Sequence, residues 1–299
     1  MICPIHATEE FRERGTLRVL FNKANLNLDV INLICIFCGL VFIDHPKKDT
    51  TDSGHHHREI NQNDIKIKSG VAKYLKSFIK SKDRVLDIGC GYGTLPYLLK
   101  LQHPYSEIKG IEMNEQDVQT AKKVYNLDIF HGSLEQFYKP KDYYDVIILH
   151  HTFEHFSNPC KELGTISKML TPDGLIYIAV PNILNINKRP EIFFQTSHPF
   201  SYSPYSLNRL AEFMGLKSFR FNWNADYPGG MQFIFKKYSN ILEPKKLKGN
   251  TEEIKEYIEK IKNKFDRLRK LRNILLFWLP KKMKINIGRI VYLWMKNSR

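Results

Sequence analysis

The sequence predicts an α/β fold: a doubly wound sheet of mainly parallel strands with helices on both faces. Between residues 64 and 238, apolar runs of strand length alternate with segments of helical pattern. Strands separated by helices of this length pair in parallel and need covering on both faces. Two further alternating runs, 217–223 and 231–238, flank the turn-rich stretch 226–230, which predicts an antiparallel hairpin at the sheet edge.

The expected elements follow from the pattern of apolar residues along the chain. In chain order they are a helix at 64–80, a strand at 84–89, a helix at 94–102, a strand at 107–114, a helix at 115–125, strands at 127–132 and 145–151, a helix at 160–170 and a strand at 174–182. Around this central domain, 64–238, we expect a cysteine/histidine segment at 1–45, a polar linker at 46–63 and a basic helical tail at 239–299.

The composition is that of a soluble globular protein, with 42% hydrophobic and 26% charged residues. Five scattered cysteines do not suit a secreted disulfide scaffold, so we expect a reducing, cytoplasmic compartment. The first residues lack the pattern of a signal peptide. The longest apolar run, 33–43, is well short of the roughly 20 residues that span a bilayer. Most of the net charge of +15 lies in 241–299, which argues against a chain built throughout to bind nucleic acid.

The stretch VLDIGCGYG, residues 85–93, places three alternating glycines behind a predicted strand. Glycine there lets the backbone approach a ligand that a Cβ would keep away. Asp87 lies where it would repel a pyrophosphate and favour a cation. Glu112 ends the second predicted strand, where a carboxylate can accept both hydroxyls of a ribose. S-adenosylmethionine, a cationic nucleoside that carries an amino acid, suits both carboxylates. A nicotinamide dinucleotide or an empty loop is the alternative.

Residues 64–238 resemble the class I S-adenosylmethionine-dependent methyltransferases. The resemblance rests on four motifs in the family's order: VLDIGCGYGT, GIEMN, DVIILHHTFEHFSNP and LTPDGLIYIAVPN. It implies a Rossmann-like sheet of seven strands that ends in the hairpin. The methionine end of the cofactor would lie against the glycine loop and His150, and the adenine beside Ser133, where the family often has aspartate. The residues assigned to the cofactor are Asp87, Gly89, Gly91, Glu112, Met113, Ser133, Leu134 and His150.

A hydroxyl or acidic carbon that receives a methyl group must lose a proton, and histidine titrates nearest to neutral pH. His150 and His151 follow the fourth predicted strand, at the edge where open α/β sheets bind ligands. Packing or backbone positioning is the alternative for both, and Glu154-His155 is expected to brace the loop. SHPFSYSPYSL resembles a segment of sugar-modifying methyltransferases in which a histidine faces the acceptor. His198 is therefore the favoured base, with capping of the following helix as its alternative.

The first 45 residues contain two paired-ligand motifs, Cys3-x-x-His6 and Cys35-x-x-Cys38. Two-residue gaps let neighbouring ligands point at one tetrahedral metal, so the four residues predict a structural zinc site. The segment also resembles the zinc-ribbon front end of bacterial sugar and glycan methyltransferases. The alternative is a set of buried free thiols on a strand.

The basic tail predicts one charged helix at 251–272, with an apolar stripe that includes Ile254, Ile258 and Ile261 opposite lysines and arginines. Packing of this stripe on the body of the protein or across a homodimer is one interpretation. Peripheral contact with an anionic membrane surface is the second, helped by the aromatic residues and lysines of 278–296. Nucleic acid is the least favoured partner.

These observations predict a cytoplasmic enzyme that methylates an oxygen or carbon of a sugar or of a nucleotide- or lipid-linked glycan precursor, as in polysaccharide biosynthesis. Oxygen or carbon is favoured because the Asn-Pro-Pro-Tyr signature of amine methylation is missing, and Val180-Pro181-Asn182 ends the fifth predicted strand instead. The alternatives are an O-methyltransferase of quinones or other small molecules, and a non-catalytic module that binds zinc and S-adenosylmethionine.

Overall fold

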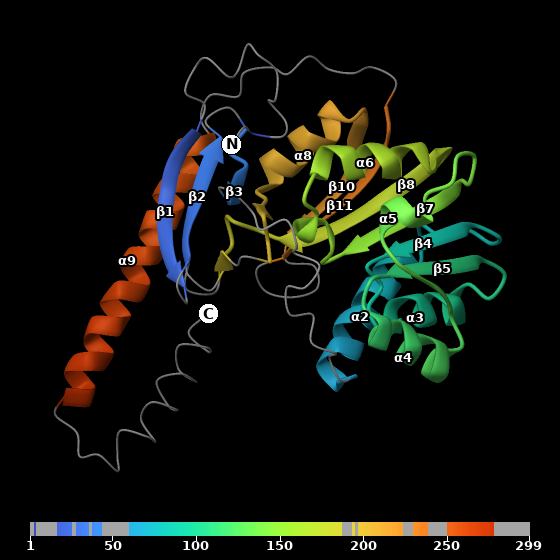
Figure 1. The fold of residues 1–299 in the computed structure, drawn as a ribbon, viewed down its shortest axis with the longest axis horizontal. Coiled ribbons are helices and arrows are strands. Elements are labelled where there is room, and N and C mark those ends of the chain that lie inside the picture. The colour runs from blue at the N-terminus through green and yellow to red at the C-terminus, as the bar shows by residue number, and fades with distance from the viewer. Residues whose placement is uncertain are drawn as a thin grey trace.

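The structure is a computed structural model of the 299-residue chain. It describes residues 3, 17–25, 28–35, 38–43, 60–186, 193–194, 197–223, 230–238 and 250–277. Its central feature is a seven-stranded sheet of order β10-β11-β8-β7-β4-β5-β6 (Figure 1). Strands β8, β7, β4, β5 and β6 run parallel, and β11 pairs antiparallel with both β8 and β10. The predicted α/β fold and its terminal hairpin are confirmed.

The bounds of the elements agree with the sequence pattern except at some ends. The strands are β4 (Arg84–Ile88), β5 (Glu107–Glu112), β6 (Asp128–His131), β7 (Tyr144–His150), β8 (Leu170–Pro181), β10 (Leu216–Trp223) and β11 (Gly230–Lys237). The helices around them are α2 (Gln62–Leu75), α3 (Thr94–Gln102), α4 (Glu115–Tyr125), α5 (Leu134–Phe137), α6 (Pro159–Lys168) and α8 (Pro204–Phe213), with a 3-10 turn η3 (Phe153–His155). Leu170, predicted as helical, belongs to β8 because it pairs with Tyr144 of β7.

Alternate side chains of the central strands enter two different cores. Val85 and Val146 pack with α2 and α3 on one face, while Leu86 and Ile147 pack with α6 and α8 on the other. All four of these strand side chains are buried, as a parallel sheet covered on both faces requires. The central strands are thus covered on both faces, and the predicted site residues lie at their carboxyl ends.

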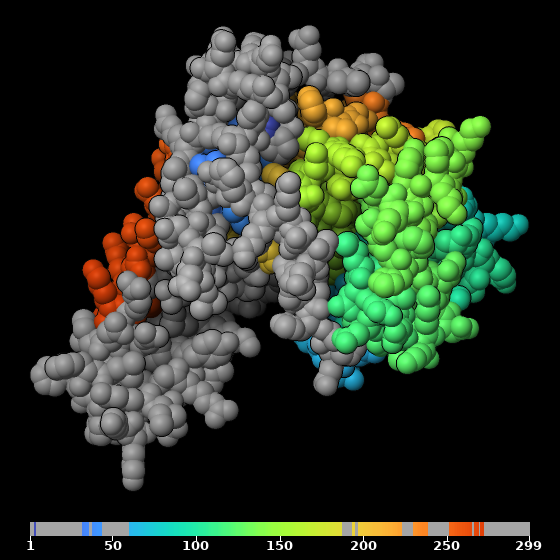
Figure 2. Space-filling view, viewed as in Figure 1, coloured from blue at the N-terminus to red at the C-terminus, as the bar shows by residue number. Residues whose placement is uncertain are grey.

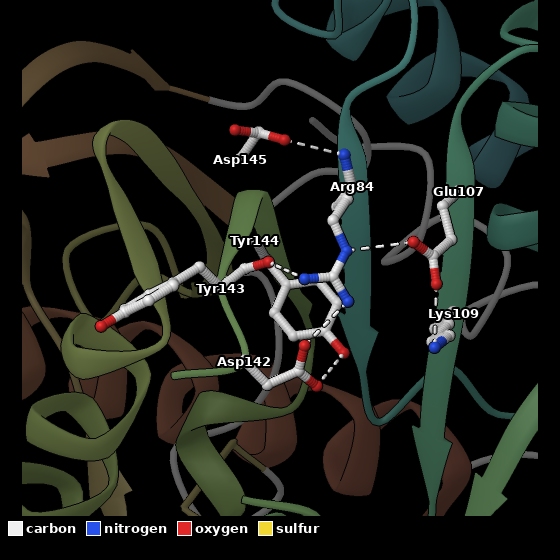
Figure 3. A network of polar contacts seen from close by, with 7 residues as sticks. All are labelled: Arg84, Glu107, Lys109, Asp142, Tyr143, Tyr144 and Asp145. Atoms are coloured by element: carbon white, nitrogen blue, oxygen red, sulfur yellow. Dashed lines mark hydrogen bonds and ion pairs between the residues drawn. The ribbon is translucent and has the colours of Figure 1, made fainter. Parts of the chain in front are cut away.

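The opposite, amino-terminal edge of the sheet is held by Arg84 at the start of β4 (Figure 3). Its guanidinium donates to Glu107 at the start of β5, at 3.0 Å, and to Asp142 just before β7, at 2.8 Å. It also donates to the carbonyl of Tyr143 and lies over the ring of Tyr144. One cation therefore ties three neighbouring parallel strands together, far along the strands from the predicted site.

A second, four-stranded sheet of order β1-β2-β3-β9 is built largely from the N-terminal segment. Its strands are β1 (Leu17–Asn25), β2 (Leu28–Cys35), β3 (Val41–Ile43) and β9 (Phe200–Ser201), and each neighbouring pair is antiparallel. Because β9 lies in the chain between β8 and α8, it joins this sheet to the central domain. Leu40 and Phe42 share the core of the central sheet. The domain boundaries drawn from the sequence stay predictions.

Helix α9 (Asn250–Phe277) confirms the predicted charged helix. Its first turns pack on the body: Ile254 and Ile258 are buried with Ile34 and Val41 of the N-terminal sheet, and the Tyr257 hydroxyl accepts from the backbone N–H of Ile186. The rest of the helix runs along the side of the molecule that is farthest from β4 and β5 (Figure 2). Among the described residues, the search for a helix with the length and hydropathy of a membrane span finds none.

Candidate functional site

The candidate site lies where β4 and β7 end side by side. From β4 the chain continues to β5 and β6 on one side, and β7 returns to the other side of β4. Open α/β sheets bind ligands at such a reversal of strand order, outside the carboxyl ends of the strands. Asp87 near the end of β4 and His150 at the end of β7 flank this position.

The loop after β4 leaves its backbone open to a ligand. Gly89, Gly91 and Gly93 have φ angles of +71°, +57° and +86°, in the left-handed region that favours glycine. A Cβ on Gly89 would lie 2.4 Å from Oγ1 of Thr152, so the η3 segment fixes this glycine. A Cβ on Gly91 would meet no described atom within 4 Å. The backbone at Gly91 is therefore the part of the loop that a ligand can approach.

The environment of Asp87 favours a positively charged ligand. Its side chain is 2% exposed, and Oδ1 is buried with no hydrogen-bond partner among the described residues. Burial raises the pKa of this carboxyl to about 7, while Lys68 opposes that rise and Glu112 adds to it. A buried carboxylate without a partner is costly, so its presence beside an open glycine loop indicates a positively charged ligand.

Glu112, at the end of β5, is fixed by main-chain donors. Its Oε2 accepts from the N–H of Gly91 at 2.8 Å, and its Oε1 accepts from the N–H groups of Met113 and Asn114 at 2.7 and 2.8 Å. A carboxylate has about four acceptor positions, so about one stays available on Oε2. A ribose hydroxyl can use that position, and a second hydroxyl would have to share an oxygen with the main chain.

The residues expected beside the adenine lie just beyond. Met113 is half exposed, and the side chain of Leu134 is buried in the main core. Ser133 caps α5 in a reciprocal pair with Gln136, which leaves little of its side chain for a ligand. Any adenine contact at this position would therefore involve the exposed Met113 or the backbone rather than the Ser133 hydroxyl.

Lys68 is a site residue that the sequence did not reveal. It projects from α2 and its ammonium lies 3.0 Å from Nδ1 of His150, which must therefore accept. Burial lowers the pKa of His150 well below its usual value, and the charges of Lys68 and His151 lower it further. His150 therefore accepts a proton only weakly, which disfavours it as a base.

His151 begins the turn after β7 with a φ angle of +56°, which is rare for a residue other than glycine. Its backbone N–H donates to Ala179, and its Nδ1 lies 3.2 Å from Oε1 of Glu154. Strained backbone of this kind is concentrated at functional sites. The imidazole is partly exposed, so a ligand can approach it.

Glu154 brings three histidines together. It is 2% exposed, and although burial raises its pKa, the hydrogen bond from His151 and the charges of His151, His155 and His198 outweigh burial, so that its pKa is lowered. His198 lies just before β9 with its ring centroid 4.8 Å from that of His155. The predicted bases His151 and His198 therefore belong to one cluster around a buried carboxylate.

Three of the four predicted zinc ligands also converge. Cys3, Cys35 and Cys38 are buried, none is in a disulfide, and their sulfurs lie within 4.8 Å of one another. The sulfurs of Cys3 and Cys38 are 3.8 Å apart, which matches the roughly 3.8 Å expected between two thiolates on a tetrahedral zinc with Zn–S bonds of about 2.3 Å. The fourth predicted ligand, His6, lies outside the described residues.

Comparison with known proteins gives a family and distant relatives. A family model described as a methyltransferase domain matches residues 56–218, more than half of the chain. The uncharacterized methyltransferase C1B3.06c of Schizosaccharomyces pombe is 23% identical over 124 residues, which cover 38% of this chain and 45% of that protein. The ubiquinone biosynthesis O-methyltransferase of Neisseria meningitidis serogroup A is 27% identical over 117 residues, or 37% of this chain and 47% of that protein. The chain thus spans about half the length of the curated relatives it matches.

Solved structures share the fold. The mitomycin 7-O-methyltransferase MmcR has a TM-score of 0.51 at 16% identity, over 64% of this chain and 58% of that one. The plantazolicin methyltransferase BpumL, in complex with a triazolic desmethylPZN analog and SAH, has a TM-score of 0.50 at 18% identity, over 65% of this chain and 92% of that one. At these identities the likeness establishes the seven-stranded α/β architecture alone.

Proposed function

The chain belongs to a family of methyltransferase domains, and we propose that it transfers the methyl group of S-adenosylmethionine to an oxygen of a sugar or glycan precursor. The observation that carries this proposal is Asp87, a buried carboxylate whose Oδ1 has no hydrogen-bond partner among the described residues, beside the open backbone of Gly91. A pyrophosphate would be repelled there, whereas the ammonium group of the methionine end would supply the missing charge.

The residues around Asp87 suit the rest of this cofactor. When bound, S-adenosylmethionine supplies a methyl group on a positively charged sulfur. Gly89 and Gly91 would let the backbone lie against its methionine end, and Glu112 would accept from the ribose. Met113, Ser133, Leu134 and His150 complete the proposed contacts, with Leu134 and Ser133 acting through the backbone because their side chains are occupied.

His151 is the proposed base. Glu154 accepts from Nδ1 of His151 at 3.2 Å, so Nδ1 carries the proton and Nε2 carries the lone pair that would accept one. A buried carboxylate that orients an imidazole in this way also stabilises the imidazolium that forms when the acceptor hydroxyl loses its proton. His198 is the second candidate, and His150 the third because of its lowered pKa.

Oxygen is preferred over carbon because relatives named for O-methylation recur among the matches, including malonyl-[acyl-carrier protein] O-methyltransferases. The sugar or glycan acceptor rests on the resemblance of the segment around His198. The ubiquinone biosynthesis relatives favour a second candidate, a quinone or other phenolic acceptor.

A structural zinc ion held by Cys3, His6, Cys35 and Cys38 is part of the proposal. The converging buried thiols support it. A cytoplasmic location stays a proposal, as do a homodimer and contact of the tail with a membrane surface. Since Ile254 and Ile258 are used by the body, such contact would depend on residues beyond the first turns of α9.

Calorimetric titration of S-adenosylmethionine into the full chain tests the cofactor. Binding by the native protein and by Asp173→Asn, an exposed carboxylate control, with loss in Asp87→Asn, would support the proposal. Binding of nicotinamide dinucleotide instead would contradict it. Labelled donor incubated with enzyme and cell extract would then identify the acceptor by mass. Cofactor binding without any transfer would favour the non-catalytic module.

A further inference from the structure

We propose that Glu154, His155 and His198 form a second metal site, which takes a divalent ion of the Zn²⁺, Co²⁺ or Ni²⁺ type. The site is separate from the cysteine cluster and has nitrogen and oxygen ligands only. It is built from the η3 turn after β7 and from residue 198 before β9, which are far apart in the sequence.

The first support is the geometry of the three side chains. One ligand atom from each lies within 4.8 Å of the ligand atoms of the other two. Ligands about 2.0–2.2 Å from a tetrahedral ion are about 3.4 Å apart, so the side chains would have to close by at most about 1.4 Å to reach this spacing. Two imidazoles with one carboxylate form a donor set suited to divalent transition metals.

The second support is the way His155 is oriented by a contact on its other ring nitrogen. Nδ1 of His155 lies 2.7 Å from the carbonyl oxygen of Ser197. A carbonyl can only accept, so Nδ1 carries the proton and Nε2 keeps its lone pair. Metal-binding histidines are oriented in this way by a backbone carbonyl or a carboxylate on their other nitrogen. The contact with Ser197 also links the η3 turn to the residue next to His198.

Glu154 supplies the third and independent support. Its Oε1 is engaged by His151, whereas its Oε2 is buried and has no hydrogen-bond partner among the described residues. The residue is 2% exposed, so bulk solvent hardly reaches this oxygen. A buried carboxylate oxygen that has no hydrogen-bond partner and lies among imidazoles is suited to bind a metal ion.

Three protein ligands leave at least one coordination position for another group. Because Glu154 also holds His151, an oxygen of the acceptor bound to the ion would lie next to the proposed base. This role for the ion rests on the proposed function, while the binding of the ion does not. In this arrangement His198 is a ligand rather than a base.

Cobalt titration of the full chain tests the site, because thiolate ligands give Co²⁺ an intense charge-transfer band in the near ultraviolet that a nitrogen–oxygen site lacks. Every protein in this experiment carries the substitutions His55→Ala, His56→Ala and His57→Ala, so that this run of histidines cannot bind the ion. The protein with these three substitutions alone is the background protein. After removal of loose metal, we expect one ion with thiolate bands and a second with ligand-field bands alone. Cys35→Ser should remove only the first.

Glu154→Gln and His198→Asn should each weaken the second ion by at least about tenfold, whereas His103→Asn, a histidine at the end of α3, should not. Two variants are used because one could disturb the fold, which circular dichroism reports. The inference would be overturned if the folded background protein bound no second ion. It would also be overturned if Glu154→Gln and His198→Asn both folded and bound the second ion as tightly as the background protein does. Calorimetry with S-adenosylmethionine on the same sample separates this outcome from failure of the proposed function.

Discussion

The ammonium group of Lys68 lies 3.0 Å from Nδ1 of His150, so the helix that precedes the first strand of the central sheet reaches into the site. The same ammonium opposes the rise of the Asp87 pKa. Lys68 therefore acts on both side chains that flank the reversal of strand order: it adds to the effect of burial in keeping His150 neutral, and it favours ionisation of Asp87.

Replacement of Lys68 by methionine should move the pH dependence of cofactor binding. Ionised Asp87 favours a cationic ligand, so affinity for S-adenosylmethionine should rise as the pH passes through about 7 in the native protein. Without Lys68 the pKa of Asp87 rises, and the midpoint should move to higher pH. Calorimetry from pH 5.5 to about 9 measures the midpoint. Lys66→Met, on the same helix but exposed, is the control, and an equal midpoint in both variants would contradict this role.

Asp87→Asn should stabilise the ligand-free protein at alkaline pH while it removes cofactor binding. The folded pKa of about 7 lies above the ordinary 3.8, so the native protein holds this proton more tightly than the unfolded chain. Its contribution to stability is complete below pH 3.8 and is lost as the pH rises through about 7. This loss is on the order of 4 kcal/mol.

Urea unfolding at pH 5 and about pH 8 measures the effect. The free energy of unfolding of Asp87→Asn relative to the native protein should be higher at the alkaline pH than at the acidic one. Asp173→Asn, on the surface of β8, should show no such difference. A pH-independent difference for Asp87→Asn would mean that Asp87 is ionised throughout.

The sequence predicted the parts of the site that a short stretch of chain defines. Asp87, the glycines and Glu112 lie at strand ends, and both strand and turn can be recognised locally. Lys68 could not be predicted, because α2 also carries Lys66 and Lys73 and only the packing of the helix on the sheet selects one of them. Asp64, on the same helix, accepts a hydrogen bond from the Tyr92 hydroxyl. The spacing of Lys68 from Asp64 does not distinguish it from the other lysines of α2.

The cluster around Glu154 was missed for a different reason. The sequence assigned Glu154-His155 to bracing of the loop and His198 to the base, and did not place them together. They meet because β9 pairs with β3 of the N-terminal sheet, which fixes the segment that precedes it. Pairing between strands more than a hundred residues apart has no local pattern. The N-terminal sheet itself was likewise not predicted.

Removal of zinc should destabilise the central domain as well as the N-terminal segment. Cys3, Cys35 and Cys38 belong to the same hydrophobic core as Leu149 of β7, so loosening the thiols loosens that core. A chelator, or Cys38→Ser, should lower the melting temperature by more than about 5 °C. Elemental analysis should show that Cys38→Ser contains one zinc fewer per chain than the native protein, whereas Cys160→Ser contains as many. The proposed site would be contradicted if the native protein without zinc had the same melting temperature as the native protein with zinc.

Arg84→Met should lower stability without affecting the site. The guanidinium ties β5 and the start of β7 to β4, and loss of its charged hydrogen bonds should cost about 1–3 kcal/mol of unfolding free energy. Lys109→Met removes a single partly exposed pair with Glu107 and should cost less than about 1 kcal/mol. Affinity for S-adenosylmethionine should be unchanged in both. Weaker cofactor binding in folded Arg84→Met would show that the two edges of the sheet are coupled.

Replacement of His151 by asparagine should slow methyl transfer without weakening cofactor binding. Asparagine tolerates the left-handed backbone at φ +56° and can still donate to Glu154, so the turn is kept while the base is lost. General bases contribute about 10²–10⁴-fold to rates, and the initial rate of label incorporation into extract should fall by a factor in that range. His103→Asn, at the end of α3, should retain the native rate. A His151→Asn rate within about tenfold of native would show that His151 is not the base.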